Sequence, residues 1–137
     1  HAGWRGTVNR ILTKTLHRMQ SAYGTEGTDV IACIGPGISL DSFEVGDEVY
    51  EAFRTENFPM EYISVWKPET HKYHIDLWAA NRLQLSDFGV PPRQIENAGI
   101  CTYRQHEDFF SARRLGIKSG RILSGIMLNG QEKGERK

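Results

Sequence analysis

Hydrophobic residues near the start of the chain recur at every third or fourth position, which is typical of a helix with one buried face. The repeat extends from Thr7 to Tyr23 and comprises Val8, Ile11, Leu12, Leu16, Met19 and Tyr23. Gly24 follows directly, at the position where glycine commonly ends a helix. The pattern therefore predicts a single amphipathic helix over residues 7–23.

Short apolar runs between glycine, proline and polar residues predict strands in the rest of the chain. These runs are Val30–Ile34, Tyr62–Trp66, Ile95–Thr102 and Arg121–Leu128. A second helix is predicted over Val45–Phe53, and the apolar face of a third includes Ile75, Trp78, Ala79, Leu83 and Leu85. Helices interleaved with short strands predict an α+β domain, built in layers as a mixed α/β sandwich.

Length and charge narrow the class of protein. The chain has 137 residues, which is enough for one domain with a core and too few for two ordinary domains. Lys plus Arg and Asp plus Glu number 17 each, so no net charge draws the chain to nucleic acid or an anionic membrane. No apolar run approaches the roughly 20 residues of a membrane-spanning helix. A small molecule or another chain is therefore the expected partner.

The polar end of the chain has little to bury. Residues 131–137 are charged or polar apart from one glycine, and we expect them to form a frayed tail. Residues 1–130 are then the part that belongs to the domain.

The cysteines and histidines offer limited chemistry. Two isolated cysteines favour a reducing compartment, so a cytoplasmic location is expected. Cys33, inside an apolar strand, is expected to be buried, whereas Cys101 is the better candidate for a reactive thiol, with packing as the alternative. His71 and His74 stand three residues apart, a weak metal signal without a third ligand.

The first six residues, His1–Gly6, combine an imidazole and a guanidinium with small residues. Glycine allows a backbone to approach a ligand closely, and a helix start can bind an anion. The alternative interpretation is a tight turn from a strand into a helix, with Arg5 in solvent. Because the chain opens on His1 and not on methionine, we expect a segment that leads into this motif to lie upstream.

A second cluster of positive charge follows two aromatic residues at Phe109–Arg114. The planar guanidinium groups of Arg113 and Arg114 can hold a phosphate or a carboxylate. The alternative is a basic hairpin in solvent, with both phenylalanines in the core.

Taken together, six motifs resemble the YfiH-like laccase-domain proteins, also called multicopper polyphenol oxidases. They occur in the family's order and are His1–Gly6, Ile34–Ile38, Phe43–Gly46, Lys72–Asn81, Gly99–Thr102 and Phe109–Arg114. The resemblance spans nearly the whole chain, which is similar to the carboxy-terminal part of a single laccase-like domain. It implies the YfiH-like sandwich, present here as an incomplete domain.

The resemblance also implies a metal centre of two histidines and one cysteine. His1 corresponds to the last ligand, while the other histidine and the cysteine would come from an upstream half. Neither Cys33 nor Cys101 corresponds to the ligand cysteine. Zinc or copper is the expected metal, and a three-ligand site with an open position suits zinc.

Two activities are attributed to this family. The first is metal-dependent purine nucleoside chemistry, namely phosphorolysis of adenosine and inosine and deamination of adenosine. The second, kept as the alternative, is copper-dependent oxidation of phenols. A further alternative is an inert fragment that needs its upstream half.

For the nucleoside enzyme, we expect His1 to bind the metal and three arginines to bind phosphate: Arg5, Arg113 and Arg114. Asp76 and Asn81 match the family pattern, but their roles remain open, since Asp76 can equally cap a helix.

Overall fold

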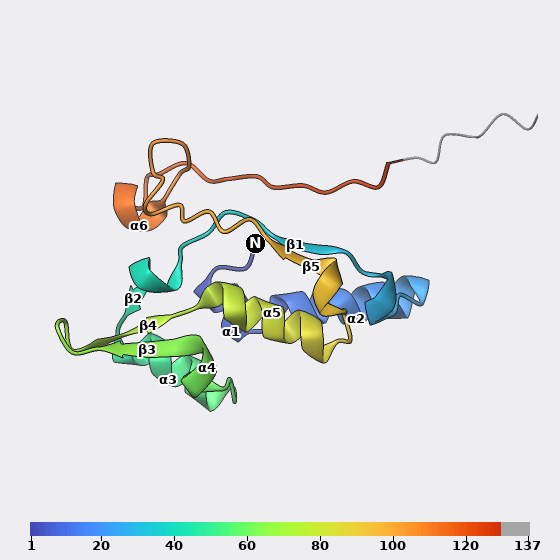
Figure 1. Cartoon of the computed structure of the whole chain (residues 1–137), viewed down its shortest axis with the longest axis horizontal. Coiled ribbons are helices and arrows are strands. Elements are labelled where there is room, and N and C mark those ends of the chain that lie inside the picture. The colour runs from blue at the N-terminus through green and yellow to red at the C-terminus, as the bar shows by residue number, and fades with distance from the viewer. Residues whose placement is uncertain (130–137) are drawn as a thin grey trace, which may run out of the picture.

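The computed structural model describes residues 1–129, in which helices and strands alternate (Figure 1). The helices are α1 Trp4–Val8, α2 Ile11–Tyr23, α3 Asp47–Thr55, α4 Met60–Ile63, α5 Leu77–Asp87 and α6 Ala112–Leu115. The strands are β1 Ala32–Ile34, β2 Glu44–Val45, β3 Ser64–Lys67, β4 Lys72–Ile75 and β5 Ile95–Asn97. The mixed α+β class predicted from the alternation is thus observed, and the predicted tail at 131–137 lies outside the described residues.

The strands form two small sheets of different kinds. β1 and β5 pair in parallel, with Ala32 opposite Ile95. The other sheet is antiparallel in the order β2-β4-β3, with β4 in the centre. An isolated parallel bridge between Gly37 and Cys101 lies beyond the first sheet. In Figure 1 helix α5 lies between the two sheets.

Two hydrophobic clusters hold these layers together. The larger cluster packs α1, α3 and α5 onto the antiparallel sheet, and its buried residues are Val8, Phe43, Val45, Val49, Phe53, Phe58, Met60, Ile63, Ile75, Leu77 and Ala80. The smaller joins α2 and α5 to the parallel sheet through Leu16, Val30, Leu85, Val90 and Ile95. Burial of one such large side chain contributes about 1.5–3 kcal/mol, so the two clusters account for much of the stability.

No helix among the described residues is long and apolar enough to cross a membrane.

The predicted helix over residues 7–23 is in fact two helices. α1 begins at Trp4 and ends at Val8, and the chain turns at Arg10, whose φ of 56° lies in the left-handed region. Contacts with distant residues stabilise the turn: the Arg10 guanidinium donates to the Glu56 carbonyl oxygen at 2.9 Å and stacks 4.4 Å from the centre of the Phe58 ring. The prediction of one helix is wrong because both helices present apolar residues to the core, so the hydrophobic repeat continues across the break.

The predicted second helix is displaced by two residues. Val45 belongs to strand β2, and α3 begins at Asp47 after Gly46. The third helix also begins later than its apolar pattern indicates. Ile75 ends strand β4, and Asp76 Oδ1 accepts a hydrogen bond from the Ala79 amide at 2.9 Å. Asp76 is therefore the N-cap of α5, the capping role considered for it from the sequence.

All four predicted strands are shorter than expected or absent, and the first is reduced to β1. Residues 60–63 form α4, so β3 begins only at Ser64, and β5 ends at Asn97. Residues 121–128 form no strand, because none of the described segments pairs with them and an extended chain becomes a strand only by pairing. The prediction of a strand over Arg121–Leu128 is wrong for the described chain.

Candidate functional site

The first six residues fold back on themselves at the start of α1. A Cβ atom added at Gly3 would lie 2.9 Å from the His1 Nε2 atom, and one added at Gly6 would lie 3.1 Å from the His1 carbonyl oxygen. The imidazole and the backbone of His1 thus occupy the space that side chains at these two positions would fill. His1 itself is exposed. The motif is a tight turn that presents one imidazole to solvent. The two interpretations of its sequence, a ligand site and a tight turn, are therefore compatible.

Buried side chains from α5 form hydrogen bonds to Thr7, near the end of α1. The Thr7 hydroxyl donates to the Ala2 carbonyl oxygen at 3.0 Å, and the Asn81 amide nitrogen donates to the Thr7 hydroxyl at 3.0 Å. One turn further along, the Gln84 amide nitrogen donates to the Thr7 carbonyl oxygen at 3.2 Å. Sequence reasoning left the role of Asn81 open and missed Gln84, because neither the hydrogen bonds nor the burial leave a local pattern.

The three predicted phosphate-binding arginines lie on two different parts of the chain. Arg5 is exposed on α1 and stacks 4.5 Å from the centre of the Trp4 ring. Arg113 on α6 donates from Nη1 to the Glu44 carbonyl oxygen at 2.8 Å, while Arg114 stacks 5.0 Å from the centre of the Tyr103 ring. No contact between described residues joins Arg5 to the α6 arginines. These assignments therefore stay predictions.

The alternative interpretation of the second basic cluster, a hairpin with two core phenylalanines, is wrong. Residues 112–115 form helix α6, and Phe110 is 55% exposed.

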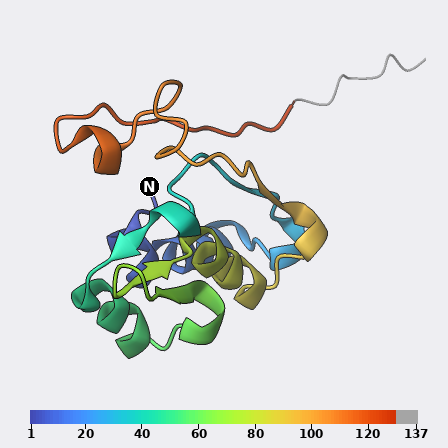
Figure 2. The ribbon, with the colours of Figure 1, turned by 60° about the vertical axis from the view of Figure 1, so that its left-hand side comes forward.

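Both Figure 1 and Figure 2 place the N-terminus between α1 and the extended segment that follows α6.

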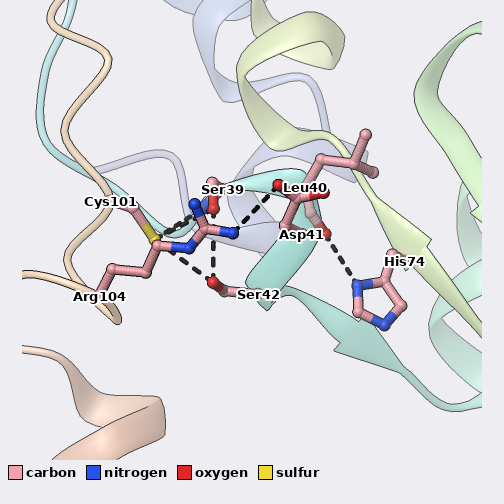
Figure 3. Close-up of polar contacts among 7 residues, drawn as sticks. All are labelled: Ser39, Leu40, Asp41, Ser42, His74, Cys101 and Arg104. Carbon is pink, nitrogen blue, oxygen red and sulfur yellow. Dashed lines mark hydrogen bonds and ion pairs between the residues drawn. The ribbon is translucent and has the colours of Figure 1, made fainter. Parts of the chain in front are cut away.

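A shallow hollow of about 430 Å³ lies beside strand β2 and contains Arg113. It is lined by Asp41, Ser42, Glu44, His74, Tyr103, Arg104 and Arg113. Arg104 donates to Asp41 at 3.1 Å, and His74 Nδ1 donates to the Leu40 carbonyl oxygen at 2.9 Å (Figure 3). Charges of both signs thus line the hollow. Of the three arginines predicted to bind an anion, Arg113 lines it.

Glu44 carries a negative charge on the wall of this hollow. Its hydrogen bond with the Thr70 side chain lowers the pKa of the carboxyl group, partial desolvation opposes this, and the nearby Lys72 ammonium lowers the pKa further. The Lys72 Nζ atom lies 3.4 Å from Glu44 Oε1. The carboxylate therefore stays ionised and limits which anions the hollow accepts.

Cys101 lies against residues 39–42, next to the hollow, and is only 6% exposed. Its Sγ atom accepts hydrogen bonds from the Ser39 hydroxyl at 3.1 Å and the Ser39 amide at 3.4 Å, and lies 3.6 Å from the Ser42 hydroxyl (Figure 3). Burial raises the pKa of the thiol, but these hydrogen bonds and one from the Arg104 amide outweigh it and lower the pKa to about 7. Hydrogen bonds to sulfur favour the thiolate, so Cys101 has the chemistry of an activated thiol in a closed position.

The other cysteine is not where its sequence context predicts. Cys33 is exposed, although it lies within the apolar run of β1. The reason is that the middle residue of a short strand points to the opposite face from its neighbours, and that face of the parallel sheet is open among the described residues. The expectation of a buried Cys33 is wrong.

The described residues contribute one candidate metal ligand at the first motif and no complete site. Within residues 1–129 no three His, Cys, Asp or Glu side chains converge as a metal site would require. His74 is buried and hydrogen-bonded, while His71 is exposed in the turn between β3 and β4, so the weak pairing signal of these histidines has no structural counterpart. His1 can supply one imidazole to a metal ion.

Comparison with known proteins relates this arrangement to a family. The family described as multi-copper polyphenol oxidoreductase laccase matches residues 1–129. The chain belongs to this family. The resemblance inferred from the six motifs is thereby confirmed.

Two relatives of this laccase-domain chain are named for enzymatic activities. A purine nucleoside phosphorylase from Bacteroides thetaiotaomicron is 66% identical over 129 residues, which cover 94% of this chain and 48% of that protein. Adenosine deaminase RL5, from an unknown prokaryotic organism, is 49% identical over 126 residues, which cover 92% of this chain and 48% of that protein. Both relatives are named as enzymes of purine nucleosides.

A solved structure confirms the fold of this laccase-domain chain. The crystal structure of the hypothetical protein YfiH from Bacillus licheniformis matches with a TM-score of 0.74 and 31% sequence identity, over 83% of this chain and 43% of that chain. The chain spans about half the length of the curated relatives it matches.

Proposed function

We propose that this chain forms the carboxy-terminal part of a purine nucleoside enzyme that phosphorolyses adenosine and inosine and deaminates adenosine. The observation that carries the proposal is the 66% identity with a purine nucleoside phosphorylase over 129 residues, which cover 94% of this chain. Residues 1–130 would then be the carboxy-terminal part of one laccase-like domain. The identity with an adenosine deaminase over a similar length supports the second reaction.

His1 is the proposed metal ligand of this chain. Its imidazole is exposed and held over Gly3, so it is available to a metal ion without rearrangement of the α1 turn. Zinc or copper takes imidazole ligands, and bound zinc would supply polarisation of a water molecule for deamination. The remaining ligands, a histidine and a cysteine, are proposed to lie upstream.

Arginine side chains are proposed to hold the phosphate. Phosphorolysis needs a phosphate oxygen to attack the anomeric carbon of the ribose while the bond to the purine nitrogen breaks and the purine leaves with a proton. Arg5 is exposed near His1, and Arg113 lines the polar hollow together with Arg104. Arg114, on the same turn of α6, is the third proposed contact. Each guanidinium offers a planar fork of donors that suits a phosphate.

The upstream part of the protein is proposed to cover two apolar surfaces of this chain. Ile31, next to β1, is 64% exposed, and the extended segment after α6 exposes Leu123, Met127 and Leu128. Exposed apolar residues beside a short sheet are typical of a surface that another segment covers. The relatives are about twice as long as this chain, which supports such a covering segment.

The two free cysteines support a reducing compartment, and we propose a cytoplasmic location on that ground.

The test uses the protein expressed from its complete reading frame, including any residues that precede His1. Purified protein is incubated with adenosine, with and without phosphate, and the products are separated by chromatography. We expect adenine and ribose 1-phosphate only with phosphate, and inosine in both samples. If neither product forms at high enzyme concentration, the proposal is wrong.

Arginine variants sharpen this test. Arg5→Ala and Arg113→Ala should reduce phosphorolysis by about tenfold or more, since each removes a charge-assisted contact worth about 1.5–3 kcal/mol, while deamination should change little. Arg18→Ala, an exposed arginine on α2, is the matched control and should leave both rates unchanged. Equal loss of both activities would contradict a specific role in phosphate binding.

Oxidation of phenols is the second candidate, favoured by the description of the matching family. Copper-loaded protein would then oxidise a phenolic dye with uptake of oxygen. Oxidation that continues unchanged after the copper is removed would exclude this activity.

The remaining candidate is an inert piece that binds nothing without its upstream half. Zinc titration of the 137-residue chain alone tests it, because one imidazole binds zinc weakly. Tight stoichiometric binding by the isolated chain would contradict a ligand set shared with an upstream segment.

A further inference from the structure

Buried hydrogen bonds connect helix α5 to the residues that follow His1. They involve Asn81 and Gln84 on α5 and Thr7 at the end of α1, all of them less than 9% exposed. A buried hydrogen bond fixes the geometry of the two groups that it joins, since displacement leaves both unpaired where water cannot replace the partner. This network connects the first motif to the core.

Thr7 is the link between α5 and the first motif. Its hydroxyl donates to the Ala2 carbonyl oxygen at 3.0 Å, and its backbone amide donates to the Gly3 carbonyl oxygen at 2.8 Å. The two carbonyl groups directly after His1 are therefore both bound to one wholly buried residue. Because His1 is exposed, these bonds are the described constraints on where its imidazole lies.

Asn81 fixes the orientation of the Thr7 hydroxyl. Its amide nitrogen donates one proton to Thr7 Oγ1 at 3.0 Å and the other to the Leu77 carbonyl oxygen at 2.8 Å. The Leu77 carbonyl can only accept, so the amide cannot be reversed without loss of this bond. With its lone pair engaged by Asn81, the Thr7 hydroxyl must direct its own proton to Ala2.

The side-chain oxygen of Asn81, unlike the nitrogen, forms no hydrogen bond with a described residue. This atom, Oδ1, is buried. An unpaired buried acceptor opposes folding, so it offsets part of what the two nitrogen bonds contribute. The amide nitrogen orients Thr7 by the hydrogen bond to its hydroxyl.

Gln84 has a different function in the same network. Its oxygen accepts from the Thr13 hydroxyl at 3.0 Å and the Thr13 amide at 3.3 Å, and its nitrogen donates to the Thr7 carbonyl oxygen. It thereby joins the end of α1 to the start of α2, and none of these hydrogen bonds reaches residues 1–6. Gln84 stabilises the helix junction and serves as the internal comparison.

We propose that Asn81 and Thr7 form a positioning pair that sets the His1 imidazole for metal binding. The inference rests on the proposed function, because it assumes that His1 is a ligand. Both residues act through the Ala2 carbonyl, so they are positioning residues and not catalytic ones. Groups that orient a metal ligand change metal affinity by 10–100-fold when they are lost.

Two variants of Thr7 test the pair in the protein expressed from its complete reading frame. Thr7→Val keeps the shape and removes the hydroxyl, while Thr7→Ser keeps the hydroxyl. We expect Thr7→Val to weaken zinc binding by about 10–100-fold, measured by competition with a chromophoric chelator, and Thr7→Ser to restore affinity to within about threefold. Asn81→Leu should weaken zinc binding about tenfold, with little change in the melting temperature.

Gln84→Met is the matched control for simple loss of stability. It keeps the volume and removes buried hydrogen bonds, so the melting temperature should fall while zinc affinity stays the same. If Thr7→Val and Gln84→Met lower zinc affinity and melting temperature in the same proportion, the positioning role is wrong and the network is only structural.

A metal-free measurement separates this inference from the proposed function. In the nuclear magnetic resonance spectrum, the His1 imidazole of the wild-type protein should give one ordered signal, and Thr7→Val should shift it toward the value of a free histidine. If zinc does not bind the wild-type protein but this difference is present, the proposed metal site fails and the positioning of His1 stands. If the His1 signal is the same in both proteins, the inference is overturned.

Discussion

At the scale of single residues, Cys101 shows how a closed environment can still favour a charged group. The two hydroxyls and two amides around Sγ lower the pKa of the thiol to about 7, against the effect of burial. Because the pKa in the folded chain lies below that of an unfolded cysteine, ionisation stabilises the fold at high pH. This stabilisation is complete above pH about 9 and is lost as the pH falls through about 7.

Removal of the strongest hydrogen bond should therefore return the thiol to ordinary behaviour. We expect Ser39→Ala, in a Cys33→Ser background, to raise the pKa of Cys101 from about 7 toward 9, because the hydroxyl that donates at 3.1 Å is gone. The ultraviolet absorbance of the thiolate as a function of pH measures this. Ser86→Ala, an exposed serine on α5, is the control, and an unchanged titration in Ser39→Ala would contradict the assignment.

Gly3 shows a steric requirement that His1 imposes. Alanine there would place Cβ 2.9 Å from His1 Nε2, so the imidazole must move. On the proposed function, we expect Gly3→Ala to weaken zinc binding by about tenfold or more, with a change in unfolding free energy below about 1 kcal/mol because His1 is exposed. Gly125→Ala, which meets nothing within 4 Å, should change neither. Equal zinc affinity in both variants would show that His1 is not held over Gly3.

The residues of the site differ in how far sequence could reveal them. His1, Arg5 and Arg113 stand in short motifs, and the chemistry of their side chains is evident from the letters alone. Asn81 matched a motif, but its function depends on a partner 74 positions away in the chain. Long-range hydrogen bonds of this kind have no local signature, and the exposure of Cys33 likewise depends on which face of β1 is covered.

At the scale of elements, the turn at η1, Gly27–Asp29, is the tightest contact between segments. A Cβ atom at Gly27 would lie 2.3 Å from the Gly89 carbonyl carbon, in the loop that ends α5. Backbone atoms cannot move aside as a flexible side chain can. We expect Gly27→Ala to lower the free energy of unfolding by about 2–3 kcal/mol through overpacking, measured by urea denaturation.

Gly24 provides the matched comparison for this effect. It has a φ of 71°, and a Cβ atom added there would meet nothing within 4 Å. The left-handed backbone conformation is therefore the one source of strain in Gly24→Ala. That strain amounts to about 1–2 kcal/mol. A larger loss for Gly24→Ala than for Gly27→Ala would contradict the close approach of η1 to Gly89.

Elements with many residues were predicted well and short ones poorly. α2, α3 and α5 carry long enough repeats to be recognised, although their first residues were misplaced. β2 and β4 were missed because two to four residues give too little alternation, and β4 carries Lys72, Tyr73 and His74. The break between α1 and α2 depends on contacts of Arg10 with residues 46 or more positions away, which periodicity cannot detect.

At the scale of the whole molecule, the extended segment after α6 exposes large apolar side chains. Leu123 is 97% exposed and Leu128 87%, so this segment places a row of apolar side chains in solvent. Such a surface promotes association. We expect the 137-residue chain alone to self-associate, and the variant with Leu123→Asp and Leu128→Asp to elute as a monomer in size-exclusion chromatography with light scattering.

A single added charge on the same segment controls for electrostatic repulsion. Ser124→Asp adds a carboxylate without removing an apolar side chain and should leave association largely intact. If Ser124→Asp abolishes association as fully as the double variant, the apolar surface is not its cause.

The overall class followed from the alternation of helical and strand patterns, and the family followed from six motifs together. The spatial relation between those motifs did not, because the two sheets are separate and the parallel one pairs strands that are distant in the chain, β1 and β5. Which surfaces are covered is a property of the assembled fold and not of any local pattern.

Helix α5 has a consequence for how the molecule loses its structure. Ala80 belongs to the cluster around the antiparallel sheet, and Leu85, little more than one turn later, belongs to the cluster around the parallel sheet. A helix that frays from one end would expose both clusters within a few residues, so neither sheet can open while the other stays closed. The two halves of the core are therefore one cooperative unit, and amide protons of β1 and β4 should exchange with solvent through the same global opening.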